Sequence, residues 1–99
     1  MNKTQVIYKV ALKNGLYVSD YEADLMSIGN EVYLTSNGLI RVSVTPEIQK
    51  SENIPYKNVA IEIAKYVKGL VVEYKLGVYS IKREIIADYR GGNNDPQTS

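Results

Sequence analysis

The chain has 99 residues, which gives room for one domain with a modest hydrophobic core. Apolar residues make up 44% of the chain and charged residues 23%, which is typical of a globular protein and unlike a disordered one. Twelve basic residues against eleven acidic ones leave a net charge of +1, so nucleic acid or an anionic membrane would have to be held by a local patch.

The chain contains no histidine and no cysteine, and its nine tyrosines are its only aromatic residues. These absences exclude Ser-His-Asp triads, cysteine nucleophiles and metal sites built on histidine or cysteine. The glycines are scattered at predicted turns and form no phosphate loop or dinucleotide fingerprint. We therefore expect a protein that binds rather than catalyses, with no cofactor and no metal.

No stretch is apolar over the length that a membrane span needs, and the first residues show no signal-peptide apolar block. These features predict a cytoplasmic protein.

The N-terminal part predicts a β-hairpin around Asn14-Gly15, because this dipeptide between two β-rich runs is typical of a two-residue type I′ turn. Such a turn would place Leu12 opposite Tyr17 and Lys9 opposite Asp20 as a pair of opposite charges. Three tyrosines would then share one face of the hairpin, and we expect it to be the inner face: Tyr8, Tyr17 and Tyr21.

A second hairpin is expected at Asn37-Gly38, between strands at residues 31–35 and 39–45. Residues 22–30 are polar and predict a connection with a turn at Gly29-Asn30. Residues 47–53 follow Pro46 and predict a connection on the surface.

Residues 56–68 change the apolar period from two to about 3.6, which predicts a helix that ends at Gly69. The expected buried stripe comprises Val59, Ile63, Tyr66, Val67 and Leu70, with Ala60 and Ala64 beside it.

Residues 70–74 predict a strand inside the sheet, followed by a three-residue loop that ends at Gly77. Residues 78–87 fit both a strand and one face of a helix, and both alternatives stay open. Residues 91–99 lack apolar side chains, which predicts a disordered tail after a single domain at residues 1–90.

Two stretches carry a family resemblance. Residues 8–18 contain a hairpin of the type KNGxYV, and residues 60–74 contain a helix-to-strand unit of the type A-x-x-I-A-K-x-x-x-G-x-V-V-E. Together they resemble short uncharacterised open reading frames of phages and prophages of Gram-positive bacteria. The resemblance covers about a quarter of the chain. It implies an accessory phage product, and it supplies no catalytic residues.

The carboxylates of Asp20, Glu22 and Asp24 lie at alternate positions, where oxygen ligands could hold Mg²⁺ or Ca²⁺. The glycine and the distal glutamate of a calcium loop are missing, so a solvated loop is the favoured interpretation.

The tyrosine face gives a nucleic-acid hypothesis, because aromatic rings on a sheet can stack on bases. The competing interpretation is that tyrosine fills the core, since it is the only aromatic available. The candidate nucleic-acid-binding residues are Tyr8, Tyr17, Tyr21, Lys9, Lys13, Arg41 and Arg83.

The predicted helix gives a protein-binding hypothesis, because one isoleucine lies among three lysines on the side away from the apolar stripe. The candidate partner-binding residues are Lys57, Ile61, Lys65 and Lys68. Ile61 would anchor a partner and the lysines would attract acidic groups. The competing interpretation is a solvated helix face with one stray apolar residue.

The expected fold is an α+β domain in which a mostly antiparallel sheet of five to six strands carries one helix on one face. The expected function is that of a small phage-type accessory protein that binds a host or phage protein, as an inhibitor of a defence or replication factor. The alternatives are a nucleic-acid-binding module and a virion structural or assembly subunit, for which exposed sheet edges would allow homo-oligomers.

Overall fold

The computed structural model describes residues 5–91, which form a five-stranded antiparallel sheet with one α-helix. The expected α+β class and the helix packed on the sheet are confirmed. The predicted disordered tail lies outside the described residues, apart from Gly91. The strands are β1 (Gln5–Ala11), β2 (Tyr17–Ile28), β3 (Glu31–Thr45), β4 (Leu70–Leu76) and β5 (Ile81–Asp88), and the helix is α1 (Lys57–Val67).

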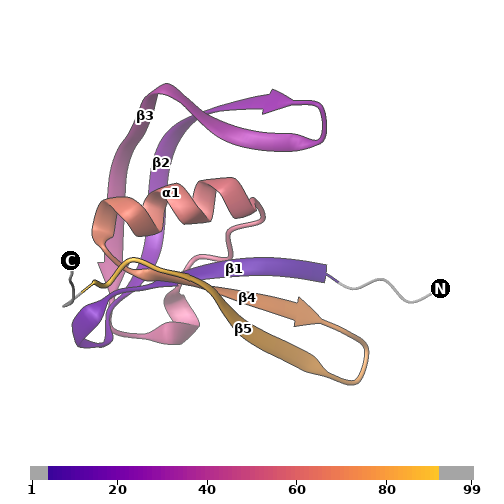
Figure 1. The fold of residues 1–99 in the computed structure, drawn as a ribbon. Helices are drawn as coiled ribbons and strands as arrows, with labels where there is room; N and C mark the ends of the chain where they lie inside the picture. The colour runs from indigo at the N-terminus through magenta and orange to yellow at the C-terminus, as the bar shows by residue number, and fades with distance from the viewer. Residues whose placement is uncertain (1–4, 92–99) are drawn as a thin grey trace.

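The strand order across the sheet is β3-β2-β1-β4-β5. The first three strands follow one another, and α1 then carries the chain across the sheet to β4, which pairs with β1 on its other side (Figure 1). The edges of the sheet are therefore β3 and β5. No helix among residues 5–91 has the length and apolar character that crossing a bilayer requires.

The first hairpin is present, but its predicted register is wrong. Asn14 and Gly15 both adopt positive φ, as the turn type requires, yet they lie in a longer loop around the 3₁₀ turn Lys13–Gly15. Ala11 therefore pairs with Tyr17 in place of Leu12. A shift of one residue moves a side chain to the other face of a strand, so Tyr17 does not share a face with Tyr8.

Strands β1 and β2 separate directly after this pair, and a segment from a distant part of the chain lies between them. Tyr8 and Ile54 exchange two backbone hydrogen bonds of 2.8 Å, and the N–H of Glu52 donates to the carbonyl of Val18 at 2.8 Å. Residues 51–54, which we call the bridging segment, thus connect the two halves of the sheet. Ser51 and Ile54 are buried, so the expectation of a wholly surface connection at residues 47–53 is wrong.

The side chain of Lys9 holds the start of the bridging segment. Its ammonium group donates to the carbonyl and hydroxyl of Ser51, at 3.2 and 2.7 Å, and to the Asn53 side chain at 2.6 Å. The predicted pairing of Lys9 with Asp20 is therefore wrong. Burial lowers the pKa of Lys9, because a partly desolvated ammonium group loses hydration.

The second hairpin turns at Gly29-Asn30, so the prediction of a turn at Asn37-Gly38 is wrong. Ile28 pairs with Glu31 across this two-residue loop, in which only Gly29 has positive φ, the pattern of a type II′ turn. Residues 22–28 are strand rather than connection, and Asn37-Gly38 lies inside β3. The hairpin is long, and its outer half bends to run alongside α1 (Figure 1).

Helix α1 buries four side chains against the sheet: Val59, Ala60, Ile63 and Ala64. They meet the buried side chains of Val10, Val18, Ile54 and Val71 in one core. Tyr66 was expected in this stripe, but 71% of its surface is exposed because the helix turns it toward β3 and solvent.

The C-terminal part settles the open alternative at residues 78–87 in favour of a strand. β5 pairs antiparallel with β4 from Leu76 opposite Ile81 to Leu70 opposite Asp88. The connecting loop has four residues and begins at Gly77, whose N–H donates to Ser80, so the three-residue loop ending at Gly77 is wrong.

Gly69 is required by a close approach of two strands. Lys68 ends α1 in the left-handed conformation, with φ of 57°, and Gly69 then runs beside β1. A Cβ at Gly69 would overlap the carbonyl oxygen of Ala11. Since this atom belongs to the backbone of a central strand, it cannot move without disturbing the sheet.

We predict that Gly69→Ala lowers the free energy of unfolding by about 1–3 kcal/mol, the usual cost of overpacking. Gly77→Ala is the matched control, because its Cβ would only touch Ser80 at 3.4 Å. Urea denaturation of both variants measures the difference. Equal stabilities would show that β4 and β1 do not approach as described.

Candidate functional site

An open groove of about 630 Å³ lies between α1 and the outer half of β3. The helix contributes Asn58, Ile61, Glu62, Lys65 and Tyr66 to its wall, and the strand contributes Tyr33, Leu34, Thr35, Gly38 and Leu39. We call it the helix–arm groove. Its lining combines apolar side chains with a few polar groups, which is the usual make-up of a binding site.

A large bulge in β3 shapes one wall of the groove. Ala23 pairs with Leu39 and Leu25 pairs with Leu34, so residues 35–38 of β3 face Asp24 alone. Gly38 adopts a φ of 67° within this bulge. Bulges bend strands, and here the bend carries the hairpin alongside the helix.

The carboxylate of Asp24 holds the bulge. Its Oδ2 accepts hydrogen bonds from the Thr35 hydroxyl at 2.6 Å and from the Asn37 side-chain amide at 3.0 Å. The backbone N–H of Asn37 also donates to the Thr35 hydroxyl, at 3.2 Å. These donors stabilise the charged carboxylate and hold the pKa of Asp24 below its usual value.

The helix wall presents an aromatic ring beside a balanced pair of charges. Tyr66 is largely exposed, and Ile61 is half-buried against the core. Lys65 forms an ion pair with Glu62 at 3.3 Å, and its Nζ lies 5.9 Å from the ring centre of Tyr89. The charge inside the groove is therefore close to neutral.

The structure brings together two of the four residues predicted to bind a partner. Ile61 and Lys65 line the groove. Lys57 lies at the start of α1, against a separate hollow beside Tyr56 and Glu31. Lys68 is exposed at the C-terminal end of the helix. The lysines thus lie along one side of α1, and of the three only Lys65 lines the groove with Ile61.

The three tyrosines of the nucleic-acid hypothesis do not form one platform. Tyr8 is buried in the core, and Tyr21 packs partly buried against it. Burial raises the pKa of both hydroxyls, with Glu73 adding to the effect at Tyr8 and Glu52 at Tyr21. Tyr17 lies on the opposite face of the sheet, in a hollow with Arg83.

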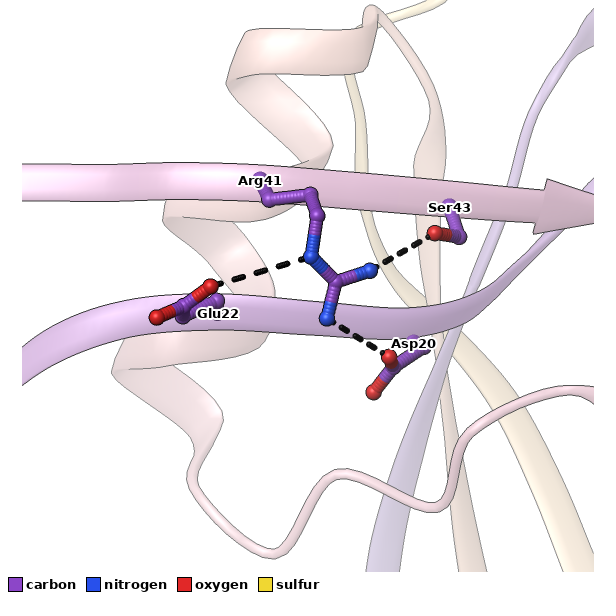
Figure 2. Close-up of polar contacts among 4 residues, drawn as sticks. All are labelled: Asp20, Glu22, Arg41 and Ser43. Carbon is purple, nitrogen blue, oxygen red and sulfur yellow. Dashed lines mark hydrogen bonds and ion pairs between the residues drawn. The ribbon is translucent and has the colours of Figure 1, made fainter.

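The cations of that hypothesis are also dispersed. Lys9 is bonded to the bridging segment, and Lys13 lies exposed in the first loop. Figure 2 shows Arg41 held by neighbours on β2 and β3: its guanidinium lies 2.8 Å from Asp20 and 3.7 Å from Glu22, and donates to Ser43 at 2.9 Å. Two carboxylates thus surround one guanidinium, which leaves no local excess of positive charge for a phosphate.

The carboxylates of Asp20, Glu22 and Asp24 do not come together around one point. Asp20 and Glu22 bind Arg41, whereas Asp24 bonds to the β3 bulge. Within residues 5–91, no cluster of three or more potential ligands could hold a metal ion.

Sequence reasoning missed the strand wall of the groove. The turn expected at Asn37-Gly38 would have folded residues 31–35 back onto 39–45, with no wall facing the helix predicted. The useful sequence signal was Gly29-Asn30, because a turn at this dipeptide allows two long strands.

Comparison of the chain with models of protein families, with curated proteins and with solved structures finds no match. The site must therefore be interpreted from its own geometry.

We predict that Asp24 titrates below its ordinary pKa of about 3.9. Because the folded-state pKa is lowered, the stabilisation is complete above the ordinary pKa and is lost as pH falls through the folded value. The NMR amide signals of Asn37 and Gly38 should follow this titration. Thr35→Val removes one donor and should raise the pKa, and an unchanged pKa in this variant would contradict the described role of Asp24.

Proposed function

We propose that this chain is a small phage-type accessory protein that acts by binding another protein in the helix–arm groove. The observation that carries the proposal is the exposed Tyr66 beside Tyr33 and Ile61 in an open groove. Tyrosine is enriched at protein interfaces, because it combines a large apolar surface with a hydroxyl that can form a hydrogen bond. The absence of histidine and cysteine supports binding over catalysis.

The chemistry of the groove defines the partner segment that we propose. Lys65 and Glu62 already balance each other, so a highly charged segment would gain little there. An apolar segment with a few polar groups would bury Tyr66 and Leu39 and meet the hydroxyl of Thr35. The resemblance to phage reading frames supports a host defence or replication factor as the target.

The proposal is tested by affinity capture from the native host with groove variants. We expect Tyr66→Ala to weaken capture of the partner about tenfold or more, since a central tyrosine contributes strongly to an interface. Lys65→Glu, which places two acidic groups beside each other, should weaken it less. The capture should survive nuclease treatment.

Tyr79→Ala is the matched control, because Tyr79 is 98% exposed in the β4–β5 loop, outside the groove. It should retain full capture, and the melting temperatures of all variants should stay close to that of the native protein. Capture that is equal for Tyr66→Ala and Tyr79→Ala, or that disappears with nuclease, would overturn the proposal.

A further inference from the structure

Strand β5 is an edge strand whose outer backbone groups can be assigned from its pairing with β4. The N–H of Gly77 donates to the carbonyl of Ser80, which makes Leu76 and Ile81 a non-hydrogen-bonded pair. Hydrogen-bonded and non-hydrogen-bonded pairs alternate along an antiparallel ladder. The N–H and C=O groups of Ile81, Arg83 and Ile85 therefore point away from β4, out of the sheet.

The side chains of the same residues leave apolar surface at this edge. Ile81 is 68% exposed and Ile85 is 57% exposed. They lie with Arg83 on the face of the sheet that α1 does not cover. An exposed edge with regular free backbone groups and two large apolar side chains is a template for another strand.

The charges of β5 are unfavourably placed within the single chain. Lys82 lies directly opposite Lys75 on β4, and Glu84 lies directly opposite Glu73. Like charges at opposed positions destabilise a strand pair. Lys75 and Glu73 of β4 form an ion pair of 3.8 Å with each other, and among residues 5–91 no ion pair joins them to Lys82 or Glu84.

We propose that β5 pairs antiparallel with β5 of a second copy of this chain, with the twofold axis at Arg83. This register bonds every outward backbone group of the three residues: Arg83 pairs with Arg83 of the second copy, and Ile81 pairs with Ile85 of the second copy on either side. The two five-stranded sheets then continue into one.

The same register places opposite charges against each other and brings the apolar side chains of the two copies into contact. Lys82 lies opposite Glu84 of the second copy, in the non-hydrogen-bonded position where side chains approach most closely. Ile81 meets Ile85 of the second copy on the uncovered face. A shift by one pair would place Lys82 against Lys82, or Glu84 against Glu84, so the charges select this register.

This inference does not rest on the proposed function, because the groove residues and the β5 edge are separate. The twofold arrangement is closed, since each copy uses its β5 edge once. The two arginines on the axis are an unfavourable contact, and each lies beside Tyr74 of its own chain.

Sedimentation velocity from micromolar to millimolar concentration tests the proposal on the full chain. The native protein should form a dimer. Lys82→Glu and Glu84→Lys should each weaken it about tenfold, because two attractive contacts become repulsive. Each change also places the substituted residue of β5 opposite a residue of opposite charge on β4. The melting temperature of the monomer should therefore not fall. The double variant K82E/E84K restores opposite pairs and should dimerise like the native protein.

A second pair of variants tests the backbone contacts. Arg83→Pro removes an outward N–H that forms no hydrogen bond with β4, and proline is tolerated at such positions of an edge strand. This variant should abolish the dimer. Arg83→Ala keeps the N–H, removes the like charges on the axis and should tighten it. A protein that stays monomeric at millimolar concentration, or a dimer that both single charge variants leave unchanged, overturns the proposal.

Discussion

The fold depends on backbone hydrogen bonds made by the bridging segment in the gap between β1 and β2. These strands share a single pair, Ala11 with Tyr17, and then diverge. Separated strands would leave buried N–H and C=O groups of Tyr8 and Val18 without partners, which is costly in a small core. Ile54 and Glu52 supply those partners, and the Ile54 side chain is buried in the core.

This gap also explains why the molecule has a groove at all. If β2 were paired with β1 along its whole length, it would stay in the sheet beside β1. Because β2 leaves β1, the β2–β3 hairpin is free to curl, and the bulge held by Asp24 directs its outer half alongside α1. The wall that carries Tyr33 and Leu39 thus follows from two backbone irregularities, while the wall that carries Ile61 and Tyr66 follows from helix periodicity alone.

That difference separates what the sequence predicts from what it does not. The helix, the strand after it and the positive φ at Asn14-Gly15 arise from local patterns, and the structure confirms them. The face of Tyr17, the position of the second turn and the burial of Ser51 depend on contacts between distant segments. An Asn-Gly pair favours positive φ equally in a turn and in a bulge, so Asn37-Gly38 alone could not distinguish them.

Amide hydrogen exchange in the bridging segment tests most directly whether these bonds hold the two halves of the sheet together. The N–H groups of Glu52 and Ile54 should exchange about a hundredfold more slowly than that of Asn53, the exposed residue between them, with Ile54 approaching the rate of global unfolding. Equal and fast exchange at all three residues would contradict the central role of the bridging segment and show that β1 and β2 are held together in another way.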